Sequence, residues 1–146
     1  MKILFITLEQ SGRQIIKSIL EDNFFKISKN QIFTYGMEKD YNDFSDLTNT
    51  KIYPIMGFVN IILNLRYIFR LRNNLNKIVN KYNFSHIFFI DSFDFSKFYL
   101  QKFKSNKIKY CQIVGPSVFI WKSKKAGFIN DNFDQLFSIF KVEKHY

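Results

Sequence analysis

The chain has 146 residues, 47% of them hydrophobic and 19% aromatic, and carries a formal net charge of +10. These values exclude an intrinsically disordered chain and predict one domain over residues 1–146 that buries roughly two-thirds of its unfolded surface. No apolar run reaches the ~18 residues of a membrane span. The single cysteine excludes an internal disulfide, and with only two histidines besides we expect no zinc site built by the protein. We also expect no cofactor.

The N-terminal region predicts a strand, a turn and a helix. Lys2–Thr7 is mostly apolar and predicts a buried strand. The stretch is too short for a signal peptide, and Glu9 follows it closely, so we expect a cytoplasmic location. Residues 8–12 form a turn in which Ser11 is a candidate N-cap, and a helix is predicted from about Arg13 to Glu21.

Two further strands are predicted after this helix. Gln31–Tyr35 predicts the second strand, which Gly36 closes. Residues 38–50 are polar and are expected to be irregular. Lys51–Tyr53 is a candidate for a short third strand, which the break at Pro54–Gly57 ends.

A long helix is predicted from about Phe58 to Tyr82, because apolar residues recur there at spacings of three or four. Three of the four arginines also lie in this helix, within seven residues of one another, and guanidinium groups bind phosphates in a bidentate way. The helix is therefore either a core helix with a solvated basic edge or an interfacial helix in contact with acyl chains and phosphates. The second interpretation assigns membrane or acyl contact to Met56, Phe58, Ile62, Leu65, Arg66, Phe69, Arg70 and Arg72.

The most informative segment is the short apolar run His86–Ile90, which predicts a buried parallel strand and ends at Asp91. Ligands in open α/β sheets bind outside the carboxyl ends of the strands, so Asp91 lies where a catalytic carboxylate is expected. A helix is predicted over Phe93–Phe103, and Asp91 is therefore either a general base or the cap of this helix. Asp94 lies in the first turn of the helix, where a carboxylate also interacts favourably with the helix dipole.

The C-terminal region continues the alternation of strands and helices. It predicts a strand over Ile108–Val114, a loop at Gly115–Ser117, a helix around Lys124–Asn130 and a strand over Gln135–Phe140. Alternating strands and helices predict an α/β fold with a Rossmann-like open parallel sheet flanked by helices.

The usual strand order of such a sheet places the first strand beside the fourth, with the switch point between them. Glu9, Ser11 and Gly12 would then face Asp91 across one crevice. Glu9 would orient a ligand or Asp91, or is a solvated turn residue. Ser11 and Gly12 open a helix N-terminus, which is an anion site in principle and a simple cap otherwise.

Four segments, in order, match the motifs of one family. Glu9–Gly12 looks like the G-E-x-S-G-D turn of bacterial lipid-A-disaccharide synthases, and Ile55–Val59 with the basic helix behind it resembles their V-M-G-x-x-E-V-L segment. Ile90–Phe95 is similar to their I-D-x-P-D-F motif. Val114–Lys122 looks like their S-P-S-V-W-A-W-R motif, so the resemblance extends over most of the chain.

The resemblance implies one half of a GT-B-type, inverting glycosyltransferase with two Rossmann-like domains: the N-terminal, acceptor-side half, without the C-terminal UDP-sugar domain. It implies transfer of 2,3-diacylglucosamine from UDP-2,3-diacylglucosamine to 2,3-diacylglucosamine 1-phosphate, forming the β-1,6 lipid A disaccharide 1-phosphate, with Asp91 as general base. The acceptor-binding residues that it implies are Glu9, Ser11, Gly12, Asp94, Pro116 and Ser117.

The implied partners are the two acylated sugars, the inner-membrane surface and a separate chain that carries the donor domain. We expect a peripheral protein that has little activity alone. Leu8 and Arg13 depart from the family pattern, which has glycine and aspartate there, and this favours the alternative of a non-catalytic lipid-binding or membrane-binding remnant. Nucleic-acid binding is not expected, because the aromatic residues fall mostly in predicted cores and the chain has no RNA-binding motif.

Overall fold

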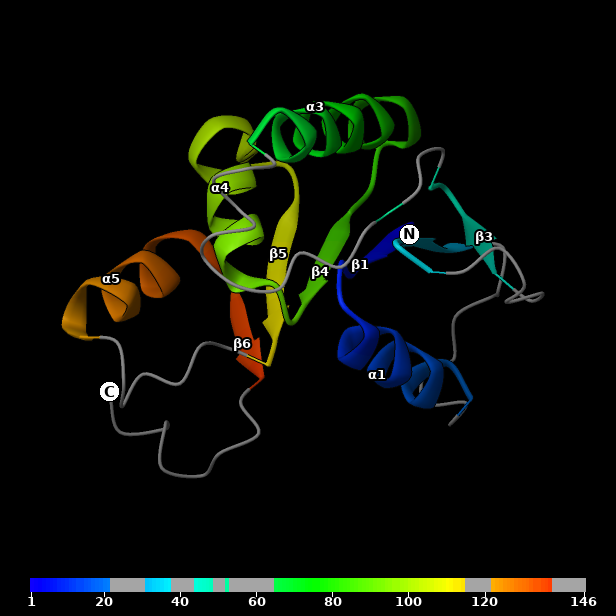
Figure 1. Ribbon diagram of the computed structural model, residues 1–146, viewed down its shortest axis with the longest axis horizontal. Coiled ribbons are helices and arrows are strands. Elements are labelled where there is room, and N and C mark those ends of the chain that lie inside the picture. Colours follow the sequence, from blue (N-terminus) through cyan, green and yellow to red (C-terminus); the bar gives the residue numbers. More distant parts are fainter. Residues whose placement is uncertain (22–30, 38–43, 49–51, 53–64, 115–121, 138–146) are drawn as a thin grey trace.

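The computed structural model describes residues 1–21, 31–37, 44–48, 52, 65–114 and 122–137, with the backbone alone for 122–126. In this part of the chain, six strands form one fully parallel sheet in the order β3-β2-β1-β4-β5-β6 (Figure 1). The strands are β1 (Ile3–Ile6), β2 (Ile32–Tyr35), β3 (Ser45–Asp46), β4 (His86–Ile90), β5 (Lys109–Ile113) and β6 (Gln135–Phe137).

The strand order confirms the predicted Rossmann-like α/β fold. β1 pairs with β4 in parallel, from Ile3 opposite His86 to Ile6 opposite Phe89. On its other side β1 pairs with β2. The order therefore reverses between β1 and β4, and their carboxyl ends form the switch point at which such sheets bind ligands.

Four helices are described: α1 (Gln10–Glu21), α3 (Leu65–Tyr82), α4 (Phe93–Phe103) and α5 (Lys122–Asn132). Alternate residues of a strand point to opposite faces, and β1 divides its side chains accordingly. Ile3 and Phe5 belong to the cluster that contains Ile16 of α1. Leu4 and Ile6 belong to the larger cluster that contains buried hydrophobic residues of α3, α4 and α5.

The predicted bounds of β4 and α4 are confirmed without change, and those of β1, α1, β2, β5 and α5 differ by one to three residues. The helix at the first turn starts at Gln10 rather than Arg13, since the Glu9 carbonyl already accepts from the Arg13 amide. Ser11 is thus the second residue of α1, and its prediction as N-cap is wrong. This frees the Ser11 hydroxyl for another partner.

The third strand was predicted in the wrong place. Ile52 is not in a strand, and β3 lies at Ser45–Asp46, within the stretch expected to be irregular. The carboxylate of Asp46 holds this strand, because its Oδ1 accepts from Thr34 Oγ1 of β2 at 3.2 Å and from Thr48 Oγ1 at 2.8 Å. A polar network rather than an apolar run builds this edge of the sheet, so hydrophobic patterning could not indicate it.

Several predictions fall on residues outside the described part of the chain. They concern the helix before Leu65, the end of the last strand after Phe137 and the loop at residues 115–117. The site assignments of Met56, Phe58, Ile62, Pro116 and Ser117 also lie outside the described residues.

Candidate active site

The switch point brings together the carboxylate and the hydroxyl that the sequence predicted there. Asp91 follows the last residue of β4, and Ser11 lies in the first turn of α1 behind β1. The Ser11 hydroxyl donates to Asp91 Oδ2 at 2.7 Å, although the two residues are 80 positions apart in sequence. This short bond fixes one oxygen of Asp91 at the crevice between β1 and β4.

Asp91 is not the cap of α4. The N-cap residue is Ser92, which has a left-handed backbone and makes no side-chain capping bond. Asp91 also has a positive φ of 56°, and its Oδ1 accepts from the Ser92 amide at 3.2 Å. A left-handed backbone is unfavourable for a residue with a side chain, and such strain concentrates at functional sites. The structure therefore favours a role for Asp91 in the crevice over a role as a helix cap.

Glu9 supplies a second carboxylate to the same crevice. Ser92 Oγ lies 3.5 Å from Glu9 Oε1 and donates to it. Partial burial raises the pKa of Glu9, the nearby charge of Asp91 raises it further, and the bond from Ser92 partly offsets both. Glu9 and Asp91 thus interact electrostatically, as expected for residues predicted to face one another.

Gly12 has a packing role in this arrangement. A Cβ at this position would lie 2.1 Å from Thr7 Oγ1 and 3.2 Å from the carbonyl oxygen of Ile90. Only glycine therefore lets α1 approach the ends of β1 and β4 closely enough for Ser11 to reach Asp91. Gly12 is buried against these strand ends, which leaves its side of the helix no room for a ligand.

An apolar pocket of about 240 Å³ is lined in part by Glu9 and by Ser92, the residue after Asp91, whereas Asp91 itself is not among its lining residues. Its polar groups belong to Glu9, Ser92 and Asp94, and Asp94 is an exposed residue in the first turn of α4. The apolar part of the wall comes from the β1 turn and the facing sides of α3 and α4: Leu8, Leu65, Ile68, Phe95 and Phe98. Of these the sequence assigned only Leu65, to membrane or acyl contact. The apolar stripe of α3 was the available signal for Ile68, but its partner helix could not be identified without the fold.

The assignment of Arg72 to membrane contact is wrong. Arg72 is buried, and its guanidinium carbon lies 4.7 Å, 4.1 Å and 5.5 Å from the ring centres of Phe69, Phe98 and Phe103. A guanidinium stacks well on aromatic faces, so Arg72 joins α3 to α4 rather than pointing into solvent. The other residues of this group that are described are exposed: Leu65, Arg66, Phe69 and Arg70.

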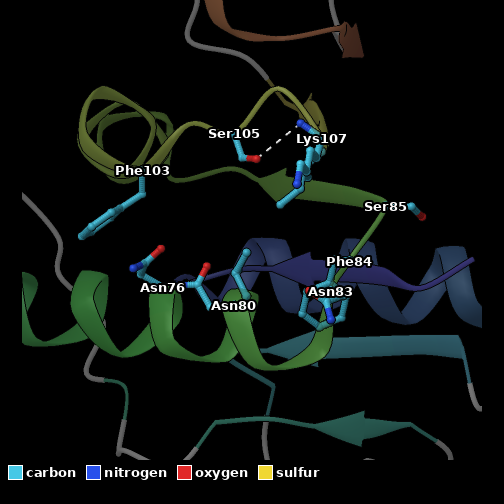
Figure 2. Close-up of a pocket in the computed structure, with 10 residues that line it drawn as sticks. Asn76, Asn80, Asn83, Phe84, Ser85, Phe103, Ser105 and Lys107 are labelled. Carbon is cyan, nitrogen blue, oxygen red and sulfur yellow. Dashed lines mark hydrogen bonds between the residues drawn. The ribbon is translucent and has the colours of Figure 1, made fainter.

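A second cavity, of about 450 Å³, lies at the opposite edge of the sheet. Figure 2 shows Asn76 and Asn80 of α3 on one side of it and Ser105 and Lys107 on the other. Its lining residues include Phe84 and Ser85 before β4 and carry amide, hydroxyl and ammonium groups without a carboxylate. Because ligands of open α/β sheets bind at the carboxyl ends of the strands, the crevice at Asp91 is the candidate active site.

The described residues contain no group of three or more His, Cys, Asp or Glu side chains that could hold a metal ion. Among these residues there is also no helix with the length and hydropathy needed to cross a membrane. The described part of the site offers the carboxylates of Glu9, Asp91 and Asp94, the hydroxyl groups of Ser11 and Ser92, and an apolar pocket.

A 3-2-1-4-5-6 parallel sheet with an acidic crevice at its switch point defines a Rossmann-like enzyme domain. The family model for lipid-A-disaccharide synthetase matches residues 3–146, and the chain belongs to this family of glycosyltransferases. The family resemblance seen in the motifs is thus confirmed. The comparison with curated proteins gave no match.

Proposed function

We propose that this chain is the acceptor-side half of a lipid-A-disaccharide synthase that transfers 2,3-diacylglucosamine from UDP-2,3-diacylglucosamine to 2,3-diacylglucosamine 1-phosphate. The product is the β-1,6-linked lipid A disaccharide 1-phosphate. The observation that carries the proposal is the position of Asp91, which is held by Ser11 at the switch point of a chain in this family. Membership of the family supports the reaction class, and the geometry supports the assignment of the base.

In this mechanism, Asp91 removes the proton of the acceptor hydroxyl as the oxygen attacks the anomeric carbon of the donor. The new glycosidic bond forms while the bond to the UDP oxygen breaks, so the configuration inverts and the proton passes to Asp91. Ser11 orients the carboxylate through Oδ2, and among the described residues Oδ1 has only a long bond from the Ser92 amide. Glu9 lies where it can accept a hydrogen bond from another hydroxyl of the acceptor.

The apolar pocket next to Glu9 and Ser92 suits an acyl chain of the acceptor. Its wall is made by side chains such as Leu8, Ile68 and Phe98, and its polar groups belong to Glu9, Ser92 and Asp94. Burial of apolar surface contributes about 25 cal/mol per Å², so the pocket would hold one end of a lipid while its sugar reaches Asp91. Leu65 lies at the pocket and is 45% exposed, which supports peripheral contact with the cytoplasmic face of the inner membrane.

We assign the UDP-sugar to a second domain or chain, as the two-domain architecture of such transferases requires. The test is to combine the purified chain with the UDP-sugar domain of a full-length family member and to measure disaccharide formation. Asp91→Asn should lower kcat by about 10²- to 10⁴-fold, the usual contribution of a general base. Asp131→Asn is the matched control, because it removes an exposed carboxylate of α5 that does not line the pocket, and it should keep most of the activity.

Full activity of the Asp91→Asn chain in this complex would refute the assignment of the base. Disaccharide formation by the chain alone would refute the proposed need for a second domain.

A non-catalytic lipid-binding protein is the second candidate. The specific observation in its favour is that the pocket and the exposed side chain of Leu65 need neither Asp91 nor a donor domain to bind a lipid. Sedimentation with vesicles rich in phosphatidylglycerol should weaken for Leu65→Asn. It should not weaken for Phe137→Asn, which alters a side chain of similar exposure at the edge of the sheet. Vesicle binding with no activity in any complemented enzyme would favour this candidate.

A further inference from the structure

A buried amide side chain lies between the ends of β4 and β5. Gln112 belongs to β5 and is fully buried, as is Ser96 of α4, which it faces. An amide without hydrogen-bond partners is costly to bury, so the groups that satisfy it indicate what it holds in place.

Gln112 is bonded at both ends of its amide. Its Nε2 donates to the carbonyl oxygen of Asp91 at 2.7 Å and to that of Val114 at 3.2 Å, and Ile113 O lies 3.4 Å away. Its Oε1 accepts from Ser96 Oγ at 2.9 Å. Main-chain carbonyls can only accept, so the amide has its NH₂ group on the side of Asp91.

The two carbonyl oxygens that accept the shorter hydrogen bonds from Gln112 belong to Asp91 and Val114, and the backbone of both residues is strained. The φ angle is 56° at Asp91 and 61° at Val114, and a positive φ is a marked outlier for a β-branched residue. Ser92 continues the strain after Asp91 with a φ of 43°. Such conformations persist only where the surrounding structure over-determines them, and here the common partner is Gln112.

We propose that Gln112 is a positioning residue that holds Asp91 in its left-handed conformation and so aims its carboxylate at Ser11. The Asp91 amide already donates to Ile113 O at 2.9 Å, so both polar groups of its main chain are tied to the end of β5. Without the bond from Gln112, Asp91 relaxes toward an ordinary φ, and its carboxylate moves away from Ser11 and Glu9. The importance of this positioning for catalysis rests on the proposed role of Asp91 as the base.

The test compares Gln112→Met with Ser96→Ala. Methionine has a similar length to glutamine and removes all bonds to Asp91 and Val114. Ser96→Ala removes a buried bond of the same network and leaves those two bonds intact. The readouts on the isolated chain are the NMR amide signals of Asp91 and its neighbours and the titration of the Glu9 carboxyl.

For Gln112→Met we expect displaced amide signals at Asp91 and Ser92. We also expect the pKa of Glu9 to fall toward its ordinary value as the charge of Asp91 moves away. Ser96→Ala should change neither. In the enzyme completed with a donor domain, Gln112→Met should lower kcat about 10- to 100-fold and leave KM within about twofold, the pattern of a misplaced catalytic group.

A folded Gln112→Met chain with wild-type Asp91 signals and wild-type Glu9 titration would overturn the inference. If this variant does not fold, the same measurements are made on Gln112→Met with Val114→Gly, since glycine removes the strain at the second turn. The NMR result does not depend on the reaction. If the assignment of Asp91 as the base is wrong, this appears separately, as full activity of the Asp91→Asn chain in the completed enzyme.

Discussion

Gly12→Ala tests whether the close approach of α1 builds the crevice. The new Cβ would lie 2.1 Å from Thr7 Oγ1, 3.0 Å from Thr7 Cβ and 3.2 Å from the Ile90 carbonyl oxygen. Thr7 is buried and belongs to the turn after β1, where its hydroxyl donates to the Glu9 carbonyl at 3.1 Å. The helix must therefore move outward by about 1 Å to reach ordinary van der Waals contact, because the threonine side chain is stiff.

The expected cost follows from three contributions. Overpacking of this kind costs about 1–3 kcal/mol, and disturbance of the Thr7–Glu9 bond adds about 1 kcal/mol. Alanine recovers about 1 kcal/mol through its better helix propensity. We therefore expect a net loss of about 2 kcal/mol in the free energy of unfolding, together with a longer distance between Ser11 and Asp91.

Urea denaturation measures this loss, and Gly127→Ala is the matched control. Gly127 also lies inside a helix, but a Cβ there would meet nothing within 4 Å, so alanine should stabilise the chain by about 0.5–1 kcal/mol. Thr7→Ala in the Gly12→Ala background should recover only part of the loss, because Thr7 Cβ and the Ile90 carbonyl remain in place. Equal effects of the two glycine substitutions would refute the packing argument.

Three other substitutions test separate parts of the structure. Glu9→Gln should stabilise the chain at neutral pH and have no effect below the ordinary pKa of a glutamate. The reason is that the raised pKa of Glu9 makes the wild-type chain lose stability as pH rises, and thermal unfolding measured against pH tests this. Arg72→Ala should cost about 2 kcal/mol in urea denaturation through its lost aromatic contacts, whereas Arg70→Ala on the exposed side should change stability by less than about 0.5 kcal/mol. Asn83→Gly should raise the melting temperature and increase the free energy of unfolding by about 0.5 kcal/mol, since Asn83 follows α3 with a φ of 54°. An unchanged or lower melting temperature would count against this prediction.

The fold could be predicted from the sequence because its central elements are encoded locally. The run before Asp91 is apolar and short, and the residues after it have helical spacing, so β4 and α4 have the expected bounds. The edge strand β3 is different, because Asp46 and two threonine hydroxyls hold it. Polar networks between segments distant in sequence leave no hydrophobic pattern.

The candidate site was predictable only in part, for the same reason. The position of Asp91 follows from a general property of parallel sheets, and the order of strands then brings Ser11 and Glu9 beside it. The burial of Arg72 depends on aromatic rings of a different helix, which α3 alone does not reveal. Gln112 likewise lies in a strand whose sequence has no unusual feature. It becomes conspicuous only in the structure, because it donates to the carbonyl oxygens of residues with positive φ angles.

The first turn of the chain departs from the family pattern at Leu8 and Arg13, and the structure explains how it forms nevertheless. Leu8 does not have a positive φ, so the turn does not need glycine there, and the leucine side chain is buried in the wall of the apolar pocket. Arg13 Nε donates to the Gly36 carbonyl at 2.9 Å and thereby ties α1 to the end of β2. Both substitutions thus serve the architecture of the crevice, and the carboxylates of Glu9 and Asp91 retain their places. The departures alone are therefore no argument against a catalytic role for this crevice.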